Sequence, residues 1–291
     1  MFAQQLANGV LLGATYALFA LGFTLIFGVL RVINLTYGFY VSAGAFLALW
    51  QVQAGLPLWV ALPVAALATG LLAMLLDFLL LARLRAARAP ELASLMVTLG
   101  AVLALYAAAG AWLGTDMRRL PPGLLSGALT LGGLRLGAAQ LLILGVTLLL
   151  LAGLVLLLRA TRLGLAIRAL AEEPEAASLV GIATARLAAV VSLLAGTLAG
   201  AAGVLIGLGT NAIHPYMGEA MMLRGFVVII VGGMGSIAGA VVAGFGLGIL
   251  EVMTAAYWDS GLKEAVAFAL MVAVLWTRPA GLFGTAAGRR G

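Results

Sequence analysis

The polar residues of this chain are concentrated in "ALAEEPEAASLVGI", residues 169–182. Three of the ten acidic residues, Glu172, Glu173 and Glu175, stand around Pro174 there. Proline favours the first turn of a helix, and acids beside it lie at the positive end of the helix dipole. The short helix that follows has a small, modestly apolar face: Ala176, Ala177, Leu179 and Val180. Such a helix suits a groove on a partner protein, although an interfacial helix without a partner is the alternative.

The other ionisable residues do not form a reactive group. His214 is the single histidine and precedes Pro215, so it has no histidine partner for a metal site or a catalytic triad. The chain has no cysteine, which excludes thiolate ligands. Asp77 lies near arginines, with which we expect it to pair, and Glu251 could face the interior of a helical bundle. Two such acids do not make a proton relay. We therefore expect neither a catalytic nor a metal site.

Composition identifies the environment of these residues. Of the 291 residues, 64% are hydrophobic and 9% are charged, whereas ordinary globular domains are roughly a quarter charged. Apolar runs recur at the roughly 20-residue length that a membrane-spanning helix needs, without the alternation of a β-barrel. The net charge of +6 comes from arginines near the ends of these runs, as topology and lipid headgroups favour. The sequence predicts an all-α, polytopic membrane helical bundle, with lipid and not nucleic acid around it.

Seven membrane spans can be placed at about 6–29, 34–52, 57–82, 92–113, 138–158, 185–209 and 263–278. Between 221 and 257, a cluster of residues predicts a break in the helix: Gly232, Gly233, Gly235 and Ser236. A half-helix at 221–232 and a longer helix at 236–257 would form a re-entrant pair or two short crossings. One long, tilted helix is the alternative. We expect about eight transmembrane helices plus this broken or re-entrant segment, in one domain over residues 1–291.

Arginine placement predicts the orientation. One loop holds Arg83, Arg85 and Arg88, and another holds Arg159, Arg162, Arg168 and Arg186. Both loops should be cytoplasmic. The N-terminus is then outside and the C-terminus inside. Glycines four residues apart predict close helix packing, within the chain or at a dimer seam: Gly196 and Gly200, Gly203 and Gly207, Gly235 and Gly239, Gly244 and Gly248.

The loop after the first span, "RVINLTYGFYVSAG", is polar and aromatic. Asn34, Thr36, Tyr37 and Gly38 stand between two apolar helices. Asparagine and glycine favour a turn or the start of a helix. This segment is either a plain connection or a broken helix start that dips toward a path through the bundle and presents backbone and hydroxyl groups there.

These features together resemble a known family. "EAASLVGI" is similar to the EAA-xxx-G loop of bacterial ABC importer permeases, with Glu175, Ala176, Ala177 and Gly181 at the expected positions. The later Ile-x-Leu-Pro part of that motif is absent. The whole chain resembles the branched-chain amino-acid permeases of the LivH type. The resemblance rests on four blocks: "LGFTLIFGVLRVINLTYGFYVSAGAFLA", "RALAEEPEAASLVGI", "GGMGSIAGAVVAGFGLGILE" and "RPAGLFG". Tyr37 and Thr36 stand where the family usually has histidine and alanine.

The resemblance implies a permease subunit of an ATP-driven importer in the bacterial cytoplasmic (inner) membrane, most simply for branched-chain amino acids. Its partners would be a second permease subunit, identical or paralogous, two cytoplasmic ATPases and an extracytoplasmic substrate-binding protein. The ATPases would bind ATP, so this chain would be no enzyme and would hold no cofactor. The loop at about 159–184 would dock on the ATPases through the residues named above: Glu172, Glu173, Glu175, Ala176, Ala177 and Gly181.

Two groups are candidates for the translocation path: Asn34, Thr36, Tyr37 and Gly38 in the first turn, and Gly232, Gly233, Gly235 and Ser236 at the predicted break. Two other functions remain open. A permease of this branch could carry urea, short amides or another small polar solute. In a different class, an ion-coupled secondary carrier would work without an ATPase.

Overall fold

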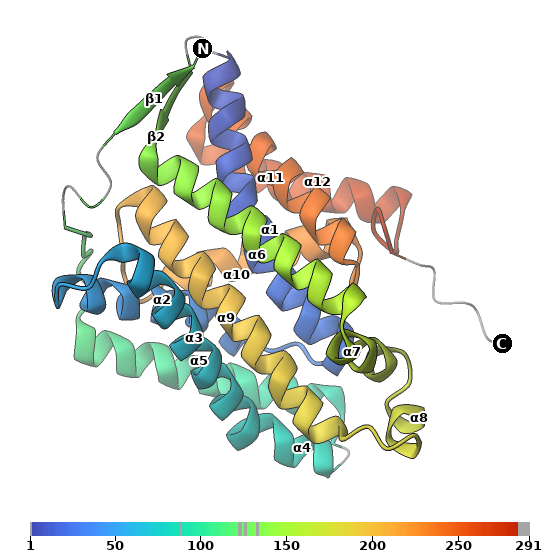
Figure 1. Cartoon of the computed structure of the whole chain (residues 1–291). Coiled ribbons are helices and arrows are strands. Elements are labelled where there is room, and N and C mark those ends of the chain that lie inside the picture. The colour runs from blue at the N-terminus through green and yellow to red at the C-terminus, as the bar shows by residue number, and fades with distance from the viewer. Residues whose placement is uncertain (1, 88, 122–123, 125–126, 132–133, 285–291) are drawn as a thin grey trace.

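Helices account for most of the chain in a computed structural model that describes residues 2–87, 89–121, 124, 127–131 and 134–284 (Figure 1). The helices are α1 (Phe2–Leu30), α2 (Thr36–Gln53), α3 (Leu58–Leu76), α4 (Ala82–Ala86), α5 (Glu91–Leu113), α6 (Ala138–Ala160), α7 (Arg162–Glu172), α8 (Pro174–Leu179), α9 (Thr184–Thr210), α10 (Met217–Gly232), α11 (Ile237–Tyr257) and α12 (Lys263–Thr277). A π-helical turn, Asp77–Leu81, joins α3 to α4, and a 3₁₀ turn, Ser260–Leu262, precedes α12. Strands β1 (Ala128–Leu131) and β2 (Leu134–Gly137) form an antiparallel hairpin that the sequence did not predict.

The all-α membrane bundle predicted from composition is confirmed. Within the described residues, seven helices are long and apolar enough to cross a membrane, with α3 and α4 counted as one. The more polar α2, of 18 residues, is the eighth, and α10, of 16 residues, is the additional segment. Exposed tryptophans at helix ends, where aromatic rings favour the lipid interface, support this reading: Trp59, Trp112 and Trp276.

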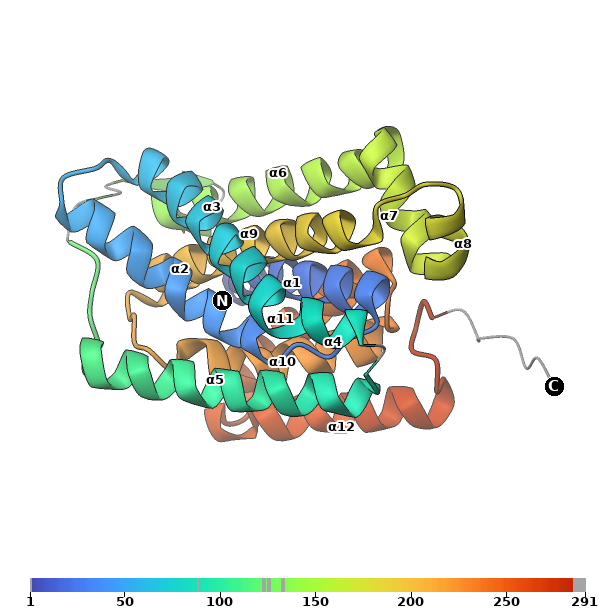
Figure 2. The ribbon, with the colours of Figure 1, turned by 90° about the horizontal axis from the view of Figure 1, so that it is seen from below.

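The bundle has two chemically different ends. At one end lie α4, α7, α8 and the last described residues (Figure 2). We call it the arginine-rich end, after Arg83, Arg85, Arg159, Arg162, Arg168, Arg186 and Arg278. The start of α1 and the β-hairpin lie at the other, hairpin end (Figure 1). Because basic residues collect on the cytoplasmic side of membrane proteins, the arginine-rich end is the predicted cytoplasmic face.

The predicted break between α10 and α11 is present, so one long, tilted helix is wrong. Gly233 and Gly235 have positive φ values of 100° and 85°, and Ser236 caps α11 by accepting a hydrogen bond from the Gly239 N–H at 3.1 Å. Gly235 lies beside Gly28 near the end of α1. The turn therefore lies at the arginine-rich end, and α11, which is long enough to cross a membrane, runs from it toward the hairpin end.

The segment after α12 returns to this turn. The backbone N–H groups of Leu282 and Phe283 donate to the carbonyls of Val231 and Gly232, at 2.8 and 3.0 Å. The described C-terminal segment thus lies at the same end as α7 and α8, as the parity of the spans requires for the predicted cytoplasmic C-terminus.

Glycines bring the central helices into backbone contact. On the seam between α1 and α11, Gly13 lies against the backbone of Phe245, Gly244 against Ala17, and Gly248 against Gly13. On α9, Gly196 meets α3 at Ala73, and Gly200 and Gly203 meet α2. Small residues permit such contacts where lipid supplies no hydrophobic drive between helices. The predicted close packing is confirmed, and these contacts lie within one chain.

We expect Gly248→Leu to prevent correct packing of α1 on α11, because its side chain would occupy the position of the Gly13 backbone. The loss should be at least about 3 kcal/mol, the upper range for overpacking. Gly246→Leu is the matched control on the same helix, since nothing lies within 4 Å of a Cβ there. Thermal unfolding in detergent measures both. Equal melting temperatures for the two variants would contradict the seam.

Candidate functional site

The helix–turn–helix at the arginine-rich end consists of α7, fixed to the bundle, and α8, which extends beyond it (Figures 1 and 2). Thr161 caps α7 by accepting a hydrogen bond from the Gly164 N–H at 3.0 Å. Gly164 contacts the backbone of α6, and Ile167 and Leu170 are buried against the bundle. One face of α7 therefore anchors the unit.

On α8, the polar and apolar residues predicted for docking are mostly exposed. Pro174 occupies the first turn, as predicted, and Glu173 precedes it without a side-chain cap. Leu179 and Val180 are 87% and 78% exposed, whereas Ala177 is buried. The exposed residues named for the docking loop are Glu172, Glu173, Glu175, Ala176 and Gly181. An apolar tip beside acids is a surface that a protein groove could cover.

Gly181 ends α8 for a conformational reason. Its φ is +85°, and nothing lies within 4 Å of the position of a Cβ. The Gly181 and Ile182 N–H groups donate to the carbonyls of Ser178 and Ala177, each at 3.1 Å. A left-handed glycine after a helix satisfies its last carbonyls in this way. The glycine is needed for backbone conformation, not for space.

Arg31 joins this unit to the connection between α1 and α2. Its guanidinium donates to the carbonyls of Ala171 and Glu172, at 3.2 and 3.0 Å, which end α7. Arg31 itself has a positive φ of 52°. The sequence did not predict these hydrogen bonds of Arg31, because its partners lie about 140 residues away.

The first turn places the start of α2 inside the bundle and not at its end. Tyr37 is fully buried, and its hydroxyl donates toward the carbonyls of Phe19 and Ala195, at 3.1 and 3.3 Å. Both carbonyls belong to the middle of long helices, α1 and α9. Gly38 contacts Gly218 at the start of α10. This geometry is a helix start within the membrane layer.

The polar groups of this turn satisfy one another. The Asn34 side-chain oxygen accepts hydrogen bonds from the Thr36 N–H at 3.0 Å and the Thr36 hydroxyl at 2.5 Å. The Thr36 and Tyr40 hydroxyls lie 2.9 Å apart. All three side chains are buried. A closed network of this kind fixes the turn, and a role for Asn34, Thr36, Tyr37 and Gly38 in translocation stays a prediction.

The second candidate group for the path lies in the turn between α10 and α11. Gly232 contacts Gly239, Gly233 contacts Gly281, and Ser236 caps α11. These contacts, with those of Gly235, build the turn at the arginine-rich end. A role in translocation remains a prediction for this group as well.

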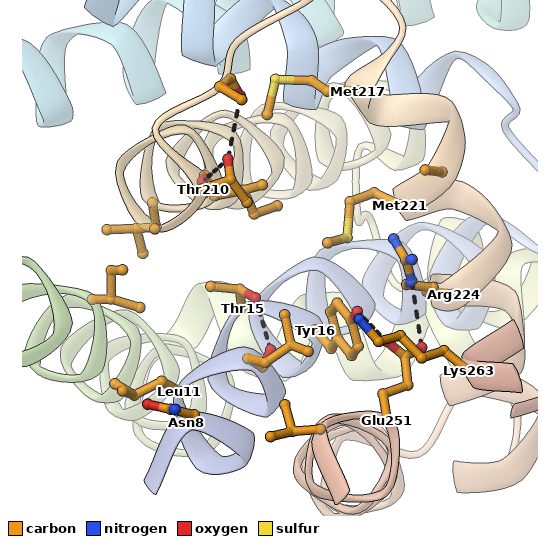
Figure 3. A pocket seen from close by; sticks show the side chains of 18 of the residues that line it. Asn8, Leu11, Thr15, Tyr16, Thr210, Met217, Met221, Arg224, Glu251 and Lys263 are labelled. Carbon is orange, nitrogen blue, oxygen red and sulfur yellow. Dashed lines mark hydrogen bonds and ion pairs between the residues drawn. The ribbon is translucent and has the colours of Figure 1, made fainter. Parts of the chain in front are cut away.

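A cavity of about 590 Å³ lies between α1, α6, α9, α10, α11 and the start of α12 (Figure 3). Met117 and His214 contribute to its lining from loops at the hairpin end. Its polar and charged residues are Asn8, Thr15, Tyr16, Gln140, Thr210, His214, Arg224, Glu251 and Lys263. None of the eight residues predicted for the path lines this cavity.

Three of these side chains meet in the cavity. The Tyr16 hydroxyl donates to Glu251 Oε2 at 2.7 Å, and Arg224 Nε lies 3.4 Å from Glu251 Oε1 (Figure 3). The Arg224 guanidinium also lies 5.8 Å from the centre of the Tyr16 ring, within the range of a cation–π contact. Glu251 is 2% exposed, which confirms that it faces the interior.

Sequence reasoning named Glu251 but missed Tyr16, Arg224 and Lys263. One signal was available for Arg224, an arginine in the apolar stretch "MMLRGFVVII", because charged residues inside a span are rare and usually functional. The expected pairing of Asp77 is confirmed by two hydrogen bonds from Arg85, at 2.8 and 2.6 Å.

The chain forms a bundle of membrane-spanning helices, with a charged cavity toward one end and an exposed helix–turn–helix at the other. This is the architecture of a membrane permease. The chain belongs to the family described as "branched-chain amino acid transport system / permease component", whose model matches residues 5–275.

Curated relatives cover nearly the whole chain. It is 31% identical to the high-affinity branched-chain amino acid transport system permease protein LivH of Escherichia coli (strain K12), with 97% of this chain and 96% of the relative aligned. LivH of Salmonella typhimurium (strain LT2) gives the same values. BraD, the corresponding permease protein of Pseudomonas aeruginosa, is 30% identical over the same shares of both chains. No solved structure matches the chain.

We expect Tyr37→Phe to lower the free energy of unfolding by about 1 kcal/mol, because the variant loses one buried hydrogen bond. Tyr257→Phe is the control, since Tyr257 is 56% exposed and should not change stability. Thermal unfolding in detergent gives the comparison. Unchanged stability together with altered solute uptake would instead assign Tyr37 to the translocation path.

Proposed function

We propose that this chain is the membrane-spanning permease subunit of an ATP-driven ABC importer for branched-chain amino acids. Membership in the permease family and full-length similarity to LivH and BraD support this proposal. In the assembled importer the chain pairs with a second permease subunit, identical or paralogous. Two cytoplasmic ATPases bind and hydrolyse ATP, and an extracytoplasmic binding protein delivers the solute. This chain itself carries no hydrolytic chemistry.

The observation that carries the proposal is α8, exposed at the predicted cytoplasmic face. Burial of α8 in lipid would be unfavourable, because Glu172, Glu173 and Glu175 surround the start of the helix. Exposure to water would be unfavourable for the apolar side chains of Leu179 and Val180. A groove on an ATPase subunit satisfies both requirements, with the acids at its rim and the apolar pair inside.

The anchoring of α7 supports transmission from the ATPases to the membrane. A docked α8 moves with its ATPase, and α7 is attached to α1 and α2 through Arg31. Closing of the ATPases around ATP would then favour one of two arrangements of the bundle, since ATP binding supplies the differential free energy.

The alternatives differ in solute and in energy source. Thr36 and Tyr37 depart from the family's usual residues, which keeps urea, short amides or another small polar solute as a second candidate. An ion-coupled carrier has less support. Among the side chains described, the buried acids Asp77 and Glu251 are each within ion-pair distance of an arginine, and no series of acids crosses the bundle.

Reconstitution of the complete complex tests these alternatives. We expect proteoliposomes with the ATPases, the partner permease and the binding protein to accumulate labelled L-leucine only with ATP. Accumulation of urea or acetamide instead would change the solute. Uptake driven by an ion gradient without ATPases would replace the function with secondary transport.

We expect Gly181→Val to reduce ATP-driven uptake severalfold while the bundle stays folded. A β-branched residue at φ +85° costs of order 1–3 kcal/mol in backbone strain, and relief of this strain would displace α8. Gly181→Asn should keep most of the uptake, because asparagine tolerates left-handed backbone. Equal uptake by both variants would remove the conformational role assigned to Gly181.

Leu179→Asp should abolish co-purification of the ATPase with this chain, because it adds a charge to the apolar tip of α8. Leu179→Met keeps the apolar surface and should retain the complex. Melting temperature controls for folding of each variant. Recovery of the ATPase at wild-type yield with Leu179→Asp would mean that the tip of α8 is not the docking surface.

A further inference from the structure

The membrane part of the described chain contains two arginine–carboxylate pairs with different geometry. Asp77 and Arg85 form a closed pair, in which two hydrogen bonds of 2.8 and 2.6 Å use both carboxylate oxygens. Glu251 and Arg224 form an open pair, with a closest approach of 3.4 Å. Only the open pair lines the 590 Å³ cavity.

The open pair leaves polar atoms without hydrogen bonds. Glu251 is buried, and neither its Oε1 nor the Nε of Arg224 has a hydrogen-bond partner. Glu251 Oε2 is satisfied by Tyr16. Burying an unsatisfied charged group is costly, and an ion pair of this kind is weak evidence for a stabilising role. Glu251 Oε1 is free to accept a hydrogen bond, and Arg224 Nε to donate one, at the wall of the cavity.

The surroundings define the chemistry of that ligand. Arg224 and Lys263 provide two positive charges, and Glu251 provides one negative charge, in the same cavity. Apolar side chains from five helices line the remaining wall: Leu11, Leu12, Ile143, Leu205, Met221 and Val252. The site therefore offers cationic groups, a carboxylate oxygen and an apolar wall, within the usual volume range of about 300–1,000 Å³ for small-molecule sites.

We propose that Arg224, Glu251 and Tyr16 bind the zwitterionic head of an α-amino acid within the membrane. The solute ammonium donates to Glu251 Oε1, and the solute carboxylate accepts from the guanidinium of Arg224. Tyr16 holds Glu251 in position through Oε2, and Lys263 adds to the positive potential. The apolar side chain of the solute lies on the aliphatic wall. This site deepens the proposed function and rests on it.

Charge balance supports a zwitterion over other solutes of similar size. One bound amino acid adds one positive and one negative group, so it replaces the weak internal pair by two charge-assisted hydrogen bonds and leaves the net charge unchanged. A neutral amide or urea brings no charged group for either Glu251 or Arg224. An amine alone brings no carboxylate for Arg224 and Lys263, and a 2-oxo acid brings no ammonium group for Glu251.

Equilibrium binding to the purified full-length chain, without the binding protein, tests the site. Labelled L-leucine is the probe, and the competitors are 3-methylbutylamine, which lacks the carboxylate, and 4-methyl-2-oxopentanoate, which lacks the amine. We expect each competitor to bind the wild type at least tenfold more weakly than leucine. No leucine binding at millimolar concentration would overturn the proposal.

The variants separate recognition from a structural role. Glu251→Gln should lose at least tenfold in leucine affinity but retain affinity for the oxo acid. Arg224→Gln should lose leucine and retain the amine. A loss of stability would weaken the binding of all three probes and would not produce these opposite selectivities. If only one of the two variants folds, its selectivity alone still tests the site. Asp77→Asn is the matched control, because it breaks a buried ion pair outside the cavity and should leave the order of the three probes unchanged.

Failure of the site and failure of the proposed function give different results. If the wild-type complex accumulates leucine with ATP but Glu251→Gln and Arg224→Gln bind the three probes as the wild type does, the site is wrong and the function stands. If the wild-type complex takes up no amino acid, the proposed function is wrong, whatever the variants bind.

Discussion

Hydrocarbon offers no hydrogen-bond partners, so each polar group between these helices depends on a partner inside the protein. This constraint accounts for the closed networks of the bundle. Asn34, Thr36 and Tyr40 satisfy one another, and the Tyr37 hydroxyl reaches backbone carbonyls. Asp77 receives both of its hydrogen bonds from Arg85. Against this background the unsatisfied atoms of Glu251 and Arg224 mark the one buried ion pair of the described chain whose geometry is incomplete.

The same absence of water removes the hydrophobic drive between helices, so contact area and close approach decide which helices are central. The glycine seam between α1 and α11 places α1 deep in the bundle, where 83% of its most apolar stretch is buried. In helices α5, α6 and α12, no more than 22% of the most apolar stretch is buried. The cavity lies beside the tightly packed α1, which gives Tyr16 and the facing α11 a fixed spacing.

The spans could be predicted closely because each is a local property of about 20 residues. The helix break at Gly233 and Gly235 and the helix start at Pro174 were likewise local, since each depends on the backbone preference of one or two residues. The cavity, in contrast, depends on contacts between residues far apart in sequence. Tyr16 and Glu251 are 235 residues apart in sequence, and no periodicity of the chain predicts that they meet. The start of α2 was recognised as a polar turn, but its depth depends on how Gly38 packs against Gly218.

A continuous series of contacts connects α8 to the cavity. Arg31 links the end of α7 to the segment that leads into α2. The first turn of α2 then contacts α10, where Gly38 meets Gly218 and the Gly218 N–H donates to Ser42 at 3.1 Å. The same α10 carries Arg224 into the cavity, less than two turns further along. Because a helix moves as a rigid unit over this length, a shift of α2 that displaces the start of α10 also moves Arg224 relative to Glu251 on α11. The open pair therefore lies at the end of a series of contacts that begins at α8. A movement passed along this series from the predicted cytoplasmic face would change the distance between the two charges of the proposed solute site.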